Sequence, residues 1–287
     1  MTIYDQMVAA YSQQRGTATP NVEQEVMQHL ALAGLHRGGF FQYAAFYGGT
    51  CLRLFHHLPR YSEDMDFSLI EKRDDIHIES FFPAIIEEFR LAGHEVSIVK
   101  KDKKEFGRVE SAFLKDNTEA YDIKFQTKKS VKVKIELDTD PPLAFDTEQL
   151  TLQQPYSFMT RCFTLPDLYA GKMHALVYRS WQRRVKGRDW YDFEWYVRWN
   201  VPLHFEHLQE RIREFNGKEV GKEAFLDLLR EKLATTDIQR VKEDVIGFVD
   251  NPHELDIWSN DYFLQLADRI IFKETKATRG QTLHLEP

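Results

Sequence analysis

Two hydrophobic patterns divide the chain. After residue 165, apolar residues recur every three or four positions, which in a helix places them on one face. This spacing predicts helices at residues 166–183, 188–199, 205–215, 222–235, 238–248 and 259–273. A further helix is predicted from Pro20, with Asn21 as its cap and the glycines at 34, 38 and 39 at its end.

Before residue 140, alternation of apolar and polar residues predicts strands. The clearest run extends from Val131 to Asp138, where apolar residues alternate with charged ones. Shorter runs predict strands at 95–99, 108–114 and 121–125, and residues 76–93 have the spacing of an amphipathic helix. Residues 40–47 are apolar and aromatic, a pattern that fits either a buried strand or the end of a helix.

These elements predict an α+β fold, with a small mixed sheet flanked by helices and a helical part after it. Residues 139–142, with two prolines, end the strand pattern, and residues 143–164 are expected to form a loop-rich connection. We therefore predict two domains, at 1–155 and 156–287. Residues 1–19 are polar and weakly patterned, and the last dozen are typical of a frayed tail.

Composition and charge exclude several classes of protein. The chain of 287 residues has a net charge of −7, so any basic surface must be local. Cys51 and Cys162 lie far apart, which argues against a zinc module or a disulfide scaffold and fits a reducing cytoplasm. No run approaches about 18 uninterrupted apolar residues, so no membrane span is expected. The first residues lack the pattern of a signal peptide.

The candidate chemistry centres on residues 47–69. Gly48 and Gly49 let backbone N–H groups approach an anion, and a helix that begins just after them points its positive end at the same place. Asp64 and Asp66 lie two positions apart in a predicted strand, so they face one side. Two adjacent carboxylates repel each other unless a cation lies between them, which favours a site for a metal-bound nucleotide.

A second, basic stretch follows in the helical part. Between Lys172 and Arg188 there are six Lys or Arg residues and no acidic ones. Lys172 and Arg179 are two helical turns apart and share a face, which suits the negative charges of a triphosphate. By its position, Asp189 fits the cap of a helix that starts near residue 190. Asp192 is expected to be structural and paired with Arg188, and His174 to be a packed histidine.

Four motifs occur in order: Gly48-Gly49-Thr50, Arg60-x-Ser62-x-Asp64-x-Asp66, Lys172-x-x-Ala175-Leu176 and Arg188-Asp189-x-x-Asp192. Together they resemble the nucleotidyltransferases of the AbiEii/AbiGii toxin group, type IV toxin–antitoxin toxins within the DNA polymerase β-like superfamily. This resemblance implies a polymerase β-like catalytic domain followed by a helical domain. It also implies transfer of a nucleoside monophosphate from an NTP to an acceptor hydroxyl, causing growth arrest or abortive infection of phage.

The resemblance further implies a role for each motif residue. Asp64 and Asp66 would hold Mg²⁺ or Mn²⁺, and a later strand would supply a third carboxylate, for which Glu136 is favoured over Asp138. The family more often has Asp at this place, so Glu136 is a departure. Lys172 and Asp189 complete the implied catalytic set. The implied nucleotide-binding residues are Gly48, Gly49, Thr50, Arg53, Ser62, Lys172 and Arg179.

The partners that the resemblance implies are an NTP, a tRNA or another RNA as acceptor, and a cognate antitoxin in the bacterial cytoplasm. Residues 100–134 contain eleven Lys or Arg against six acidic residues, which suits an RNA backbone and equally a solvated loop. Two alternatives stay open. One is a small-molecule nucleotidyltransferase of the aminoglycoside-modifying type, and the other is a nucleotide-binding module without catalysis.

Overall fold

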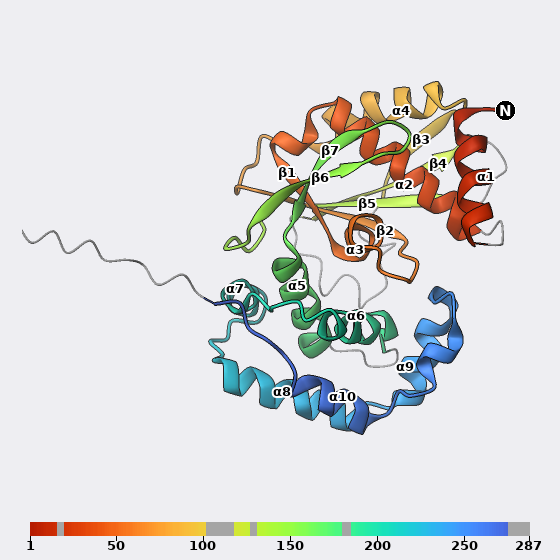
Figure 1. The fold of residues 1–287 in the computed structure, drawn as a ribbon. Helices are drawn as coiled ribbons and strands as arrows, with labels where there is room; N and C mark the ends of the chain where they lie inside the picture. Colours follow the sequence, from red (N-terminus) through yellow and green to blue (C-terminus); the bar gives the residue numbers. More distant parts are fainter. Residues whose placement is uncertain (16–19, 102–117, 127–130, 180–184, 275–287) are drawn as a thin grey trace, which may run out of the picture.

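A mixed sheet of seven strands forms the first part of the fold in the computed structural model, which describes residues 1–15, 20–101, 118–126, 131–179 and 185–274 (Figure 1). The strand order is β3-β4-β5-β2-β1-β7-β6. Two pairs, β2 with β5 and β1 with β7, are parallel, and the other neighbours are antiparallel. The strands are β1 (Ala44–Tyr47), β2 (Asp64–Leu69), β3 (Val96–Lys100), β4 (Thr118–Phe125), β5 (Lys132–Asp138), β6 (Thr147–Leu152) and β7 (Phe158–Phe163).

The two central strands have one apolar and one polar face. Met65 and Phe67 on β2 and Ile135 and Leu137 on β5 are fully buried in the core, whereas the acidic residues between them are only half-buried. Because alternate residues of a strand point to opposite sides, the carboxylates of both strands share the face away from this core.

Helices pack on the sheet and on one another. These are α1 (Ile3–Arg15), α2 (Pro20–Arg37), α3 (Gly48–His56) and α4 (Phe82–Leu91), with short 3₁₀ turns at Phe40–Gln42 and Ile78–Phe81. The contact between α2 and α4 is unusually close, since a Cβ added to Gly34 would lie 2.6 Å from the Cα of Ile85. Only glycine fits at this crossing.

The second part of the fold is helical. It contains α5 (Leu165–Tyr178), α6 (Gly187–Arg198), α7 (Phe205–Asn216), α8 (Lys222–Thr235), α9 (Ile238–Val245) and α10 (Asn260–Ala267). Aromatic side chains fill its core; the rings of Trp190 on α6 and Phe263 on α10 meet edge to face at 4.7 Å. In Figure 1, α5 leads from the sheet into this region, and α7 and α6 lie to either side of it. No helix in the described part of the chain is long and apolar enough to span a membrane.

The predicted α+β class is confirmed, and each predicted C-terminal helix has an observed counterpart. The loop-rich connection predicted at 143–164 is wrong, because β6 and β7 form a hairpin there and β7 joins the sheet beside β1. The sheet therefore extends to Phe163, beyond the boundary predicted at 155. The helix predicted at 166–183 ends at Tyr178.

Two further differences lie near the N-terminus. Residues 3–15 form α1 despite the weak hydrophobic pattern of this segment, and Tyr4 and Met7 lie on one face of the helix and are buried. Residues 40–47 form both a 3₁₀ turn and β1. The strand predicted at 108–114, most of the basic segment 100–134 and the predicted tail lie outside the described residues.

Candidate active site

The Gly48-Gly49 pair joins β1 directly to α3, which begins at Gly48. Gly48 has a φ of +82°, a conformation that favours glycine, and a Cβ added there would lie 2.1 Å from Oδ2 of Asp66. A Cβ on Gly49 would lie 2.7 Å from Oγ of Ser62. The absence of both side chains therefore lets the acidic strand β2 and the segment before it approach the N-terminus of a helix.

Three carboxylates meet on adjacent parallel strands. The register of β2 and β5 places Asp64 beside Lys134 and Asp66 beside Glu136. Burial, together with the charges of Glu136 and Asp64, raises the pKa of Asp66 to about 7, against the opposing effect of nearby lysines. Lys134 also forms an ion pair with Glu136. This concentration of negative charge is the environment that a divalent cation would relieve.

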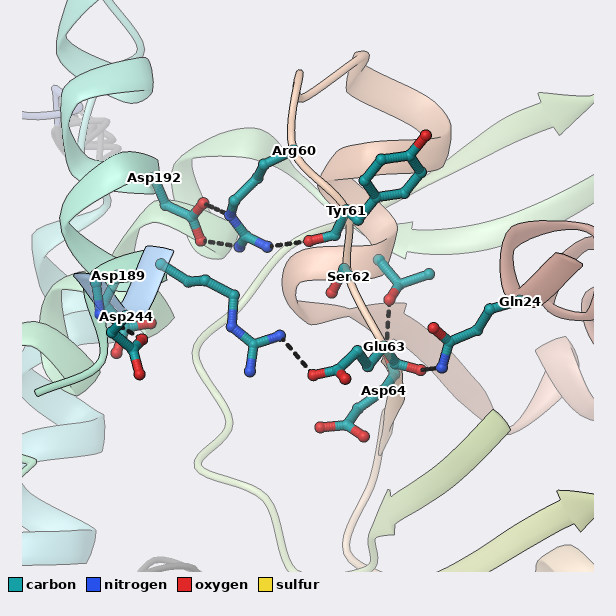
Figure 2. Close-up of polar contacts among 12 residues, drawn as sticks. Gln24, Arg60, Tyr61, Ser62, Glu63, Asp64, Asp189, Asp192 and Asp244 are labelled. Atoms are coloured by element: carbon teal, nitrogen blue, oxygen red, sulfur yellow. Dashed lines mark hydrogen bonds and ion pairs between the residues drawn. The ribbon is translucent and has the colours of Figure 1, made fainter. Parts of the chain in front are cut away.

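A buried ion-pair network joins this sheet face to the helical region. The guanidinium of Arg60 binds both carboxylate oxygens of Asp192 at 2.6 Å, and both side chains are almost fully buried (Figure 2). The Nζ of Lys172 lies 2.7 Å from the same carboxylate. Burial raises the pKa of Asp192, but Arg60 and Lys172 together outweigh that effect and keep it below its ordinary value.

Asp189 contacts both Lys172 and Arg179, the two cations predicted to share one face of a helix. Its carboxylate lies 3.6 Å from Nζ of Lys172 and 3.4 Å from Nη1 of Arg179. The expectation that Asp189 caps a helix near residue 190 is wrong, because α6 begins earlier, at Gly187, without a side-chain cap. The expected pairing of Asp192 with Arg188 is also wrong, since Arg188 binds Glu63 at 3.0 Å.

Two of the predicted nucleotide-binding side chains point elsewhere. The hydroxyl of Thr50 donates a hydrogen bond to the carbonyl of Asp64 and is fully buried. The guanidinium of Arg53 donates to Glu25 at 3.1 Å and to the carbonyl of Leu58 at 2.9 Å. Neither residue lines the pocket described next. Both side chains lie on the buried side of α3, so the motif did not predict the direction in which they point.

A pocket of about 210 Å³ lies between the polar face of the sheet and the helices α5, α6 and α7. Gly48, Gly49, Ser62, Asp64, Asp66, Glu136, Lys172, Arg179 and Asp189, all predicted site residues, line it. Asp138, the alternative third carboxylate, also lines it. The structure thus brings nine predicted residues to one cavity, from positions as far apart as 48 and 189.

Two further cations line this pocket, Lys186 and Arg211. Lys186 belongs to the basic stretch between Lys172 and Arg188, whereas sequence reasoning missed Arg211. Burial lowers the pKa of Lys186 to about 8, and the neighbouring Arg179 contributes to this shift. Arg211 lies on the inner side of α7, one helical turn from His207 and from Phe215, which also line the pocket. His174 is packed as expected, with its Nε2 2.8 Å from Oδ1 of Asn216.

Another acidic cluster supports the start of α5 beside the pocket. The buried carboxylate of Asp167 accepts hydrogen bonds from the hydroxyl of Thr164 at 2.5 Å and from the backbone of Asp146 at 3.1 Å. It also contacts Nδ1 of His204 at 2.5 Å. These contacts link the end of the sheet to α5 and α7, so they help to fix the helices that close the pocket.

Comparisons with known proteins agree with this architecture. A family model described as "Nucleotidyl transferase AbiEii toxin, Type IV TA system" matches residues 30–266. The solved structure of MenT4, a nucleotidyltransferase toxin from Mycobacterium tuberculosis H37Rv, is similar with a TM-score of 0.56 and 14% identity, over 92% of this chain and 87% of that one. JHP933 from Helicobacter pylori is similar with a TM-score of 0.50 and 15% identity, over 86% and 90% of the two chains. At these identities the two structures show a shared fold. No curated protein sequence matches this chain.

Proposed function

This chain belongs to the AbiEii family of nucleotidyltransferase toxins of type IV toxin–antitoxin systems, and on that premise we propose that it transfers a nucleoside monophosphate from an NTP to a hydroxyl group of an RNA. One observation carries the proposal. The carboxylates of Asp64, Asp66 and Glu136 face Lys172 across a pocket that begins at the N-terminus of α3. Acidic groups for a metal and cationic groups for phosphates therefore line one cavity.

The acidic residues fit a divalent metal. Oxygen ligands are what Mg²⁺ and Mn²⁺ prefer. The pKa of Asp66 is raised first by burial and then by the negative charges of Glu136 and Asp64, and a cation beside it would offset both effects. We assign Asp64, Asp66 and Glu136 as the residues that would hold the metal, with Asp138 as the alternative to Glu136. When bound, such a metal supplies Lewis-acid polarisation of the phosphate oxygens.

The nucleotide phosphates would bind at the glycine pair. The backbone N–H groups at the start of α3 and the partial positive charge of the helix N-terminus favour an anion there. Lys172 and Arg179 would neutralise phosphate charge from α5, and Asp189 would hold both cations in place. Ser62 lies beside Gly49 and offers a hydroxyl to the same phosphates. Thr50 and Arg53 would act indirectly, by fixing α3.

The reaction then follows from these positions. The acceptor hydroxyl oxygen forms a bond to the α-phosphorus, and the bond from that phosphorus to the leaving pyrophosphate breaks. Glu136 would accept the proton that the hydroxyl loses, as a general base on the open face of β5. The cations opposite would stabilise the charge that develops on the phosphate oxygens.

RNA is the acceptor that we favour, and tRNA is the class that the family resemblance suggests. The pocket is lined by Lys134, Lys186, Arg188 and Arg211 in addition to the proposed phosphate ligands, which suits a second polyanion. We place the reaction in the bacterial cytoplasm, where NTPs and tRNA occur together. Modification of RNA would arrest growth, and a cognate antitoxin would counteract it.

Transfer is tested by incubating the protein with Mg²⁺, total bacterial RNA and each α-labelled NTP in turn. We expect label in a tRNA-sized band with one NTP. Asp66→Asn should abolish labelling, whereas Asp75→Asn should retain it, because Asp75 is exposed and pairs only with Arg73 among the described residues. Label in a small molecule would support the aminoglycoside-type alternative, and binding of NTP without any transfer would support a non-catalytic module.

A further inference from the structure

We propose that Arg211, on α7, binds a phosphate group of the substrate in the pocket. The chemical identity of that substrate rests on the proposed function, but binding of phosphate by Arg211 can be measured without any transfer reaction. Arg211 lies outside the four motifs that resemble the family, so no part of that resemblance assigns it a role.

Arg211 differs from five other pocket cations in lacking an acidic partner among the described residues. Within the described part of the chain it makes no ion pair, and its buried Nε has no hydrogen-bond partner. Five other cations that line the pocket each have a carboxylate within ion-pair distance: Arg60 with Asp192, Lys134 with Glu136, Lys172 with Asp192, Arg179 with Asp189, and Arg188 with Glu63.

The position of Arg211 favours a ligand in the pocket as its missing partner. Its guanidinium lies over the ring of Phe215, 5.2 Å from the ring centroid, and so is held by its own helix. Burial lowers the pKa of Arg211 more than the nearby Tyr47 and Asp138 raise it, and Arg179 lowers it further. A cation in this setting is incompletely compensated until an anion arrives.

Phosphate is the anion that fits this side chain. Guanidinium groups bind phosphate oxygens through paired N–H donors, and such charge-assisted hydrogen bonds are stronger than neutral ones. Asp66 and Glu136 line the same cavity and would repel an anionic ligand, so a phosphate there would depend on the metal that these residues would hold as well as on Arg211. The phosphate has two sources, the triphosphate of the NTP or the backbone of the acceptor RNA.

Binding measurements with Arg211→Gln separate these sources. Isothermal titration calorimetry with inorganic triphosphate, in the absence of RNA, tests whether Arg211 binds the triphosphate of the NTP. Fluorescence anisotropy with a labelled single-stranded RNA, in the absence of NTP, tests whether Arg211 binds the RNA backbone, and loss of a phosphate contact in Arg211→Gln would also lower the salt dependence of binding. We expect one of the two ligands to bind about tenfold or more weakly, as for a lost charged hydrogen bond.

Arg213→Gln is the matched control, because Arg213 lies on the same helix but is exposed and pairs with Glu210. Arg211→Lys, which keeps the charge but loses the paired donors, should bind with intermediate affinity. The proposal is overturned if Arg211→Gln, with an unchanged circular dichroism spectrum, binds both ligands as tightly as Arg213→Gln does. Weakened binding together with no transfer of label by the wild-type protein would instead overturn the proposed function and leave this inference standing.

Discussion

The carboxylate of Asp66 lies against the backbone of Gly48, so closely that a Cβ on this glycine would be 2.1 Å from Oδ2 of the aspartate. Asp66 lies on β2, which pairs antiparallel with β1, and Gly48 begins α3 directly after β1. The glycine therefore does more than permit a turn. It allows a carboxylate to lie at the positive end of α3, where a phosphate would also bind.

Replacing Gly48 by alanine should abolish transfer and destabilise the protein, because the added methyl group displaces Asp66. The matched control is Gly217→Ala, which also has a positive φ, +63°, but has no atom within 4 Å of an added Cβ. We expect Gly217→Ala to cost about 1 kcal/mol of unfolding free energy and to keep full activity. Urea unfolding measures the stability of each variant, and the labelling assay measures its transfer activity. Equal losses of activity in the two variants would show that contact of the added methyl group with Asp66 is not the cause.

Breaking the pair between Arg60 and Asp192 should cost more than any exposed ion pair. Asp192→Ala leaves the buried Arg60 without its bidentate partner and removes a partner of Lys172, so we expect a loss of about 3–5 kcal/mol in unfolding free energy. Denaturant unfolding of Asp192→Ala, of Arg60→Leu and of the double variant gives the coupling free energy between the two residues. Additive effects in that cycle would show that the pair does not act as a unit.

Glu136 and Asp138 can be distinguished as the third carboxylate. Glu136 lies beside Asp66 in the strand register, whereas Asp138 lies beside Ser68. Glu136→Gln should therefore reduce the transfer rate by about 100-fold or more, and Asp138→Asn by much less. Binding of Mn²⁺, followed by electron paramagnetic resonance, supplies a second measurement. A larger loss of both rate and Mn²⁺ affinity in Asp138→Asn would assign the role to Asp138.

Acid should destabilise the fold through His174. Burial lowers the pKa of this histidine to about 3, from an ordinary value of 6.5. The unfolded chain therefore takes up a proton on it below about pH 6.5 that the folded chain does not, and stability falls as pH decreases, by about 1.4 kcal/mol per pH unit.

His174→Gln isolates that effect, because glutamine keeps a hydrogen-bonding group near Asn216 but does not titrate. Urea unfolding at pH 7.5 and 5.5 should show a smaller loss of stability on acidification in the variant than in the wild type. Because the pKa of Asp66 is raised in the folded state, this residue makes the fold more stable as pH falls. It does so equally in the variant and in the wild type, so its contribution cancels in the comparison. Identical losses in the two proteins would disprove the contribution of His174.

Local patterns predicted much of this molecule, and long-range contacts account for what they missed. Strong periodicity over residues 131–138 and after residue 165 corresponds to β5 and to the C-terminal helices, although the helices predicted at 166–183 and 259–273 end earlier, at Tyr178 and Ala267. The hairpin of β6 and β7 was missed because its alternation is weak and its place depends on pairing with β1, far away in sequence.

In the candidate site too, local motifs predicted some features, and others depend on long-range contacts. The motif residues on β2 and α5 do line one pocket, but the inward position of Thr50 and Arg53 depends on which side of α3 faces the core. The partner of Arg60 is 132 positions away, so no local rule could identify it. Arg211 was missed because an arginine on an amphipathic helix has the same sequence pattern whether it faces solvent or a cavity.

The pair between Arg60 and Asp192 also has a consequence for synthesis. A ribosome makes the acidic strands β2 and β5 well before the helices α5 and α6 that carry Lys172 and Asp192. A nascent chain therefore cannot assemble the cationic wall of the pocket until α6 has left the exit tunnel. Most of the chain must therefore be made before the two walls of the pocket can come together.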